Sequence, residues 1–100
     1  MTITCSVTQD QTRVDISVMG RFNFTLRKEF REAYRNHLAH GEYRVNLAKT
    51  DFIDSSALGM LLLLREHAEL SKSRVVLVDP KPGVRRALTI ANFDRLFTIE

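Results

Sequence analysis

Alternating apolar and polar residues predict a β-hairpin at the start of the chain. Apolar side chains occupy every second position in residues 3–8 and again in residues 13–19, which is the period of a strand with one buried face. The polar residues between the two runs suit a turn, and two such runs joined by a short link are typical of an antiparallel hairpin. Gly20 then ends the second strand, and we expect Phe22 and Phe24 beyond it to anchor the core.

A first helix is predicted after the hairpin. Thr25 is a plausible N-cap, and we expect the helix to end near His40, with Gly41 as its C-terminal stop. Apolar residues at helical spacing form one stripe, and charged residues occupy the opposite face. The stripe consists of Leu26, Phe30, Ala33, Tyr34 and Leu38.

A second helix is predicted in the middle of the chain, after a short extended piece at residues 52–53. The helix begins at Asp54 or Ser55 and runs to about residue 70. Apolar residues wrap most of its circumference between residues 57 and 64. One side of the helix should therefore pack on a sheet, and the remainder on another helix or on a partner.

Three further elements complete the pattern. Residues 43–47 alternate like a strand, and Arg74–Val78 is a nearly continuous β-branched run, typical of a strand buried on both faces. Pro82 fits the first turn of a third helix, with Asn92 as a candidate C-cap. Residues 96–99 have the pattern of a last short strand.

The order of the predicted elements is ββαβαβαβ. Strands that alternate with helices predict an α/β fold in which helices pack against a mixed, largely parallel sheet. Of the 100 residues, 44% are hydrophobic, which is enough for a core. We expect residues 1–100 to form one domain.

The charge of the chain is mildly basic, with a formal net charge of +3. Part of the excess is clustered in the first helix, and without interleaved aromatic residues we interpret this cluster as a solvated helix face. We expect no direct binding of nucleic acid. The cluster would also suit an acidic partner. It consists of Arg27, Lys28, Arg31 and Arg35.

The sequence favours a cytoplasmic protein without membrane contact. Residues 57–64, the longest uncharged apolar run, are too short to span a bilayer, and the first residues lack the pattern of a signal peptide. Cys5 is the lone cysteine and cannot form an internal disulfide, which agrees with a reducing compartment.

Recognisable catalytic, nucleotide-binding and metal-binding motifs are absent from the sequence. His37 and His40 are three residues apart in the first predicted helix, but no cysteine or carboxylate accompanies them at ligand spacing, so we interpret them as surface residues. Asp51 and Asp54 lack a second catalytic group, so the sequence does not favour hydrolysis. We expect no enzyme activity, no metal and no cofactor.

The stretch Asp54-Ser55-Ser56 carries the most specific chemistry in the chain. Asp and Ser are typical of helix N-caps, because their side-chain oxygens accept hydrogen bonds from unpaired backbone N–H groups. A hydroxyl at a helix N-terminus also lies where a phosphate is tolerated. On these grounds alone, the stretch is either only a cap or a phosphorylation site.

A family resemblance favours phosphorylation. The run from Asp54 to Met60, Asp-Ser-Ser-Ala-Leu-Gly-Met, is similar to the D-S-[ST]-G-L-G signature of STAS-domain anti-sigma factor antagonists. The resemblance covers essentially the whole chain, including Gly20 at the end of the hairpin, Phe52 before the motif, and Pro82 after the late strand. Ala57 stands where the family commonly has glycine, and the sequence ends at Glu100, where many members continue into a final helix.

The resemblance implies a switch rather than an enzyme. In that family a serine kinase, which is also an anti-sigma factor or a similar regulator, phosphorylates the first serine after the Asp. The unphosphorylated form binds this kinase and releases the kinase's other client, and a PP2C-type phosphatase restores that form. Applied to this sequence, the resemblance implies that Ser55 is the phosphoacceptor, with Ser56 as the adjacent alternative. It also implies that Asp54 shapes the helix start and supports kinase docking.

The expected docking surface is the start of the second helix together with the loops before it, including residues 49–51. Its candidate residues are Asn23, Asp51, Asp54, Ser55, Ser56, Leu58, Gly59 and Met60. For Leu58 and Met60, packing in the core is an equal alternative. Two other functions stay open, namely a constitutive binding scaffold in which Ser55 is only a cap, and a small ligand-binding STAS domain.

Overall fold

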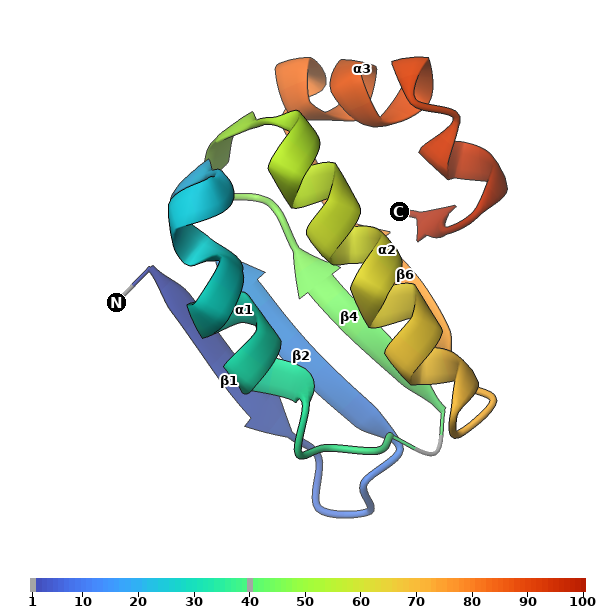
Figure 1. Ribbon diagram of the computed structural model, residues 1–100. Helices are drawn as coiled ribbons and strands as arrows, with labels where there is room; N and C mark the ends of the chain where they lie inside the picture. Colours follow the sequence, from blue (N-terminus) through green and yellow to red (C-terminus); the bar gives the residue numbers. More distant parts are fainter. Residues whose placement is uncertain (1, 40) are drawn as a thin grey trace.

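The computed structural model describes residues 2–39 and 41–100 (Figure 1). Two of its helices, α1 and α2, cover one face of a twisted sheet, and α3 lies at the end of the sheet where α2 begins. The strands are β1 Ile3–Val7, β2 Arg13–Val18, β3 Gly20–Phe22, β4 Glu42–Asn46, β5 Thr50–Ile53, β6 Arg74–Val78 and β7 Thr98–Ile99. The helices are α1 Arg27–Tyr34, α2 Ser55–Glu69 and α3 Pro82–Ile90, with 3-10 helices at Phe24–Leu26 and Phe93–Arg95.

The main sheet has five strands in the order β1-β2-β4-β6-β7. The hairpin strands β1 and β2 are antiparallel, whereas β2–β4, β4–β6 and β6–β7 are parallel pairs. The predicted α/β class, with a largely parallel sheet and helices packed against it, is therefore confirmed.

The core lies between the sheet and the two helices on its face. Alternate residues of β2 and β4 point into it, because side chains along a strand alternate between the two faces. Their register pairs Val14 with Tyr43 and Ile16 with Val45, and all four residues are 0% exposed. In β6, Val75, Val76 and Leu77 are all buried, which confirms the prediction of a strand covered on both faces.

A second sheet, formed by β3 and β5, was predicted only as a short extended piece at residues 52–53. Gly20 has a φ of +81°, a backbone conformation that favours glycine, and it turns the chain out of β2. The Gly20 N–H donates to the Lys49 carbonyl at 2.9 Å. The hydroxyl of Thr50, which is 0% exposed, donates to the Val18 carbonyl at 2.7 Å. These bonds attach β5, and the helix that follows it, to the end of β2.

Helix α1 ends at Tyr34, well before the predicted end near His40, which lies outside the described residues. The next residues are held in a non-helical conformation by the Tyr43 hydroxyl, which accepts from the Ala39 N–H at 3.0 Å and donates to the His37 carbonyl at 2.7 Å. These tertiary hydrogen bonds compete with continuation of the helix. As a result, Leu38 is 50% exposed instead of lying in the stripe.

Three other local predictions are wrong, namely the cap at Thr25, the core position of Phe24 and the helix stop at Gly41. The chain turns into the 3-10 helix one turn before α1, so Asn23, not Thr25, supplies the cap by accepting from the Thr25 N–H at 3.0 Å. Phe24 is 55% exposed, with the Arg27 guanidinium 4.6 Å above its ring, and it does not anchor the core. Gly41 precedes β4 and does not stop a helix.

Candidate functional site

Asp54 is the N-cap of α2. Its backbone is extended, with φ −110° and ψ 179°, and its Oδ1 accepts the Ala57 N–H at 2.8 Å. Its carbonyl accepts the Leu58 N–H at 3.1 Å, which closes the first turn. The helix consequently begins at Ser55.

Ser55 and Ser56 occupy the first two positions of α2. The Ser55 side chain is exposed, whereas Ser56 is half-buried. Within residues 2–39 and 41–100, neither hydroxyl forms a hydrogen bond. Both lie at the positive end of the helix dipole, where an added phosphate is favoured. Of the two, Ser55 is the more accessible to another protein.

The pairing of β3 with β5 brings Asn23 to the start of α2. Phe22 and Ile53 are register partners in this parallel pair, so the residues that follow them, Asn23 and Asp54, leave the sheet at the same edge. The Asp54 N–H donates to the Phe22 carbonyl at 3.3 Å, which joins the two chain segments. The sequence predicted both residues as docking candidates without predicting this pairing.

Asp51 is exposed and forms an ion pair with Lys81. The Lys81 Nζ lies 2.5 Å from the Asp51 Oδ1. Lys81 is the N-cap residue of α3, so the ion pair links the strand before α2 to the start of α3. Thirty residues separate the two partners, and no local spacing in the sequence indicated that they meet.

The remaining docking candidates differ in accessibility. Gly59 is exposed and Leu58 is half-buried against the core. Met60 is 5% exposed and belongs to the core cluster, so it offers almost no surface to a partner. Of the two possibilities for Met60, packing in the core therefore fits the structure better than partner contact.

Phe52 is an exposed aromatic residue that the sequence analysis treated only as part of the motif's context. Phe52 is 41% exposed, and the Arg21 guanidinium lies 4.6 Å from the centroid of its ring. Arg21 is its register partner across the small sheet. Aromatic and arginine side chains are enriched at protein interfaces, which makes this pair a candidate contact beside the motif.

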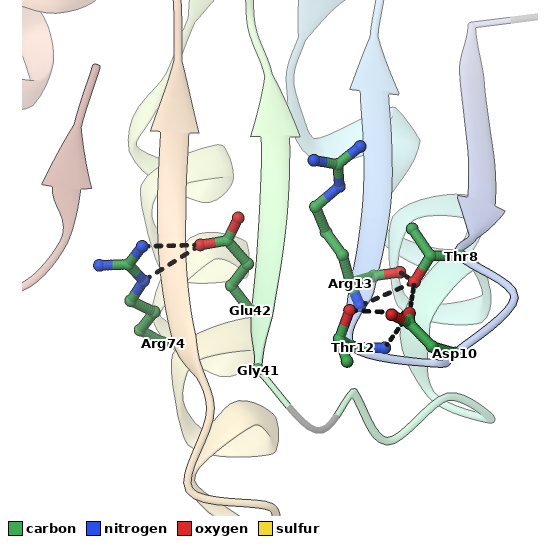
Figure 2. Close-up of a pocket in the computed structure, with 7 residues that line it drawn as sticks. All are labelled: Thr8, Asp10, Thr12, Arg13, Gly41, Glu42 and Arg74. Atoms are coloured by element: carbon green, nitrogen blue, oxygen red, sulfur yellow. Dashed lines mark hydrogen bonds and ion pairs between the residues drawn. The ribbon is translucent and has the colours of Figure 1, made fainter.

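A polar hollow lies elsewhere, beside the loop of the β1–β2 hairpin and the first residues of β4 and β6 (Figure 2). Its polar groups bond to one another. Asp10 accepts from the Thr12 N–H and from the hydroxyls of Thr12 and Thr8, and these bonds, the Thr12 hydroxyl foremost, hold the pKa of Asp10 below its usual value. Arg74 is paired with Glu42 at 3.0 Å. These pairings account for the polar side chains of the hollow as contacts within the hairpin loop and between the starts of β4 and β6.

The histidines do not form a metal site in the part of the chain that the structure describes. His37 lies after the end of α1, and its carbonyl is 2.7 Å from the His67 Nε2. Residues 2–39 and 41–100 contain no group of three or more His, Cys, Asp or Glu residues that could hold a metal ion. In the same residues, no helix has both the length and the apolar character needed to cross a membrane.

A mixed sheet, two helices on one face, and an Asp-capped pair of serines after the small β3–β5 sheet define the architecture of a STAS domain. A family model described as "Mlab, STAS domain" matches residues 5–98, and the chain belongs to this family. A STAS-domain containing protein of Pseudomonas aeruginosa (strain UCBPP-PA14) is 42% identical over 100 residues, which cover 99% of each chain. The STAS resemblance in the sequence is thereby confirmed.

Solved structures share this fold at low sequence identity. The anti-sigma factor antagonist SpoIIAA in its unphosphorylated form is 19% identical with a TM-score of 0.78, over 98% of this chain and 87% of that one. A putative anti-sigma factor antagonist from Thermotoga maritima is 21% identical with a TM-score of 0.83, over 97% and 84%. The phosphorylated form of SpoIIAA, described as a Bacillus cell fate determinant, is 17% identical with a TM-score of 0.68, over 98% and 90%.

Proposed function

We propose that this protein is a phosphorylation-switched anti-sigma factor antagonist. In its unphosphorylated form it binds a serine kinase that is also an anti-sigma factor, and the kinase's other client is released. A PP2C-type phosphatase restores the binding form. The protein works by binding, without catalysing a reaction, in the cytoplasm. The observation that carries the proposal is the exposed Ser55 hydroxyl at the Asp54-capped start of α2.

Ser55 is the proposed phosphoacceptor because a kinase must reach the hydroxyl. Ser55 is exposed and Ser56 is half-buried, so transfer to Ser55 needs less rearrangement of α2. Ser56 remains the alternative that an experiment has to exclude. The names of the solved structures lend support, since SpoIIAA has been solved in unphosphorylated and phosphorylated forms.

The electrostatics of the site explain how a phosphate would act as a switch. A phosphate on Ser55 adds about −1.5 to −2 charges directly after the Asp54 carboxylate. The unpaired N–H groups of the first turn of α2 favour this charge, so we expect the fold to survive. Before phosphorylation a partner surface packs against the neutral Ser55 hydroxyl. After phosphorylation the same surface meets a desolvated dianion. Like-charge contacts of this kind cost several kcal/mol, which changes affinity by orders of magnitude.

The proposed docking surface surrounds this serine. It consists of Asn23, Asp51, Asp54, Ser55, Ser56, Leu58 and Gly59, with Phe52 and Arg21 beside them. In this arrangement the Asp51–Lys81 ion pair places a lysine of the α3 N-cap at the border of the surface.

The test is intact-mass measurement with site mapping on the protein recovered from its own cells, before and after treatment with a PP2C-type phosphatase. We expect one phosphate on Ser55 that the phosphatase removes. Ser55→Ala should abolish it, while the matched neighbour Ser56→Ala should keep it. Binding of the unphosphorylated chain to serine kinases encoded nearby should be at least a hundredfold tighter than binding of the phosphorylated chain.

The other outcomes discriminate between the alternatives. A phosphate found on Ser56 alone would keep the switch but overturn the assignment of the residue. Absence of phosphate, together with partner binding that Ser55→Ala leaves unchanged, would show a constitutive scaffold in which Ser55 belongs only to the helix cap.

A further inference from the structure

Helices α1 and α2 lie side by side on the sheet (Figure 1). Residues of both helices line a groove between them. The groove has a volume of about 360 Å³, and its floor is formed by Phe30, Tyr34 and Met60. A second hollow of about 790 Å³ continues it toward the C-terminus of α2. Both share Tyr34 and Leu63 as lining residues, so they form one continuous trough. We call it the α1–α2 groove.

A mainly apolar stripe of α2, ending at its C-cap residue Leu70, runs along this groove. Met60, Leu63, His67 and Leu70 follow one another at spacings of three, four and three residues, which is the spacing of a helix–helix seam. Met60 is buried and His67 packs on Tyr34, with ring centroids 5.0 Å apart. Leu63 and Leu70, however, are 53% and 74% exposed. No element among the described residues covers them.

The α1 side of the groove is strongly basic. Four cationic side chains of α1 line the groove, together with a single carboxylate, that of Glu32. Within residues 2–39 and 41–100, none of the four forms an ion pair, and the Arg27 guanidinium rests on the Phe24 ring. The four are Arg27, Lys28, Arg31 and Arg35. An occupant of the groove would therefore gain by presenting carboxylates to α1.

We infer that the α1–α2 groove is a docking site for an acidic amphipathic helix of a partner protein. The apolar side of that helix covers Leu63 and Leu70, and its Asp and Glu side chains face Arg31 and Arg35. This is the helix-in-groove mode of recognition, in which apolar residues spaced by three or four positions act as anchors. From Met60 to Leu70 the stripe is about 15 Å long, which matches about three turns of a helix.

Two other occupants fit the groove less well. A second copy of this chain would bring the same basic α1 faces together in a symmetric contact, which like charges oppose. An anionic lipid surface would meet Glu66 and Glu69, which flank Leu63 and Leu70 on α2, whereas a helix can direct its carboxylates to α1 alone. The trough is also concave, whereas a bilayer surface is flat on this scale. The inference does not rest on the proposed function, because the stripe begins one turn beyond the serines and does not use them.

The test is site-specific photo-crosslinking in the cells from which the protein comes. The photoreactive residue p-benzoylphenylalanine replaces Leu63 in one variant and, as a matched control, the exposed Ile90 of α3 in another. We expect an adduct from position 63 whose mapped attachment lies in a partner segment with apolar residues at spacings of three and four and with an excess of Asp and Glu. When the substitutions Arg31→Glu and Arg35→Glu are introduced into the position-63 variant, the adduct yield should fall at least fivefold. Introducing Arg86→Glu on α3 instead should leave the yield unchanged.

The other outcomes overturn the inference. An adduct to lipid would make the groove a membrane contact, and an adduct to a second copy would make it a dimer interface. An adduct to a segment without acidic residues would remove the charge argument. Equal adducts from positions 63 and 90, or none from position 63, would show that Leu63 has no dedicated partner. Because Leu63 is half-exposed, the variants that carry the photoreactive residue at position 63 should fold. Thermal melting followed by circular dichroism would verify this.

Discussion

Asp54 stabilises the start of α2 through its carboxylate, which accepts the Ala57 N–H at 2.8 Å. We predict that Asp54→Ala lowers the free energy of unfolding by about 1 kcal/mol, the usual value of a lost N-cap. Asp54→Asn should retain most of the stability, because asparagine caps about as well as aspartate. Urea unfolding followed by circular dichroism measures both differences.

The same pair of variants separates capping from docking. Asp54→Asn keeps the cap and removes the charge next to Ser55. If Asp54 supports kinase docking, this variant should bind the kinase more weakly at nearly unchanged stability. Equal losses of stability in the Ala and Asn variants would contradict the cap assignment itself.

Residue roles could be predicted from the sequence where local chemistry determines them. Asp54 caps α2 as expected, because its partner lies three residues away in the same helix. Thr25 and Phe24 were misassigned because the chain enters α1 through a 3-10 turn that the apolar spacing does not record. The Asp51–Lys81 ion pair could not be predicted, since it depends on how α3 packs near β5.

The small β3–β5 sheet positions the candidate site, and Gly20 allows it to form. With φ at +81°, an L-residue at position 20 is strained even though an added Cβ would meet no heavy atom of the described residues within 4 Å, apart from the glycine itself and its chain neighbours. We predict that Gly20→Ala lowers the free energy of unfolding by about 1–2 kcal/mol, the cost of a left-handed backbone for a residue with a side chain. Thermal or urea unfolding measures the change.

Gly59 provides a matched control with the opposite expected sign. It lies inside α2 and has no positive φ, and an added Cβ would meet no heavy atom of the described residues within 4 Å outside its chain neighbours and the nearby backbone of α2. Gly59→Ala should therefore stabilise the protein by about 0.5–1 kcal/mol, because alanine loses less backbone entropy in a helix. Destabilisation of similar size by both variants would contradict the role of backbone conformation at Gly20.

At the scale of elements, periodicity predicted where helices and strands lie better than where they end. The strand alternation and the apolar content of α2 follow from burial, which acts on every residue of an element. The end of α1 is decided by the Tyr43 hydroxyl, which comes from β4 and bonds to both His37 and Ala39. A repeating pattern along one segment does not contain such a contact from another segment.

The main sheet presents two chemically different faces, and this difference is a property of the whole molecule. One face is covered by α1 and α2, while the other carries charged residues from neighbouring strands. Glu42 accepts from Arg44 at 3.1 Å and from Arg74 at 3.1 Å, and Arg44 also bonds to Glu100 at 2.6 Å. The alternation predicted which residues face away from the core, but these pairs require the register between β4, β6 and the C-terminus.

This ion-pair network gives stability a predictable dependence on pH. Partial burial opposes ionisation of Glu42, but the hydrogen bonds from Arg44 and Arg74 outweigh it and hold the pKa of Glu42 below its usual value. A carboxylate with a lowered folded-state pKa contributes stability above its unfolded pKa of about 4.3. That contribution is lost as the pH falls from there through the folded pKa.

We therefore predict that Glu42→Gln lowers the free energy of unfolding at pH 7 and that the difference from the unchanged protein shrinks as the pH falls below about 4.3. Urea unfolding between pH 3 and pH 7 measures both curves, because the glutamine variant has no carboxylate to protonate at this position. Glu66→Gln serves as control, since Glu66 is exposed on α2 and forms no ion pair among the residues that the structure describes. A constant difference between the Glu42→Gln and unchanged curves across this range would contradict a stabilising contribution from the charge of Glu42. A difference that disappears toward low pH would instead assign its contribution to the charge that Arg44 and Arg74 hold in place.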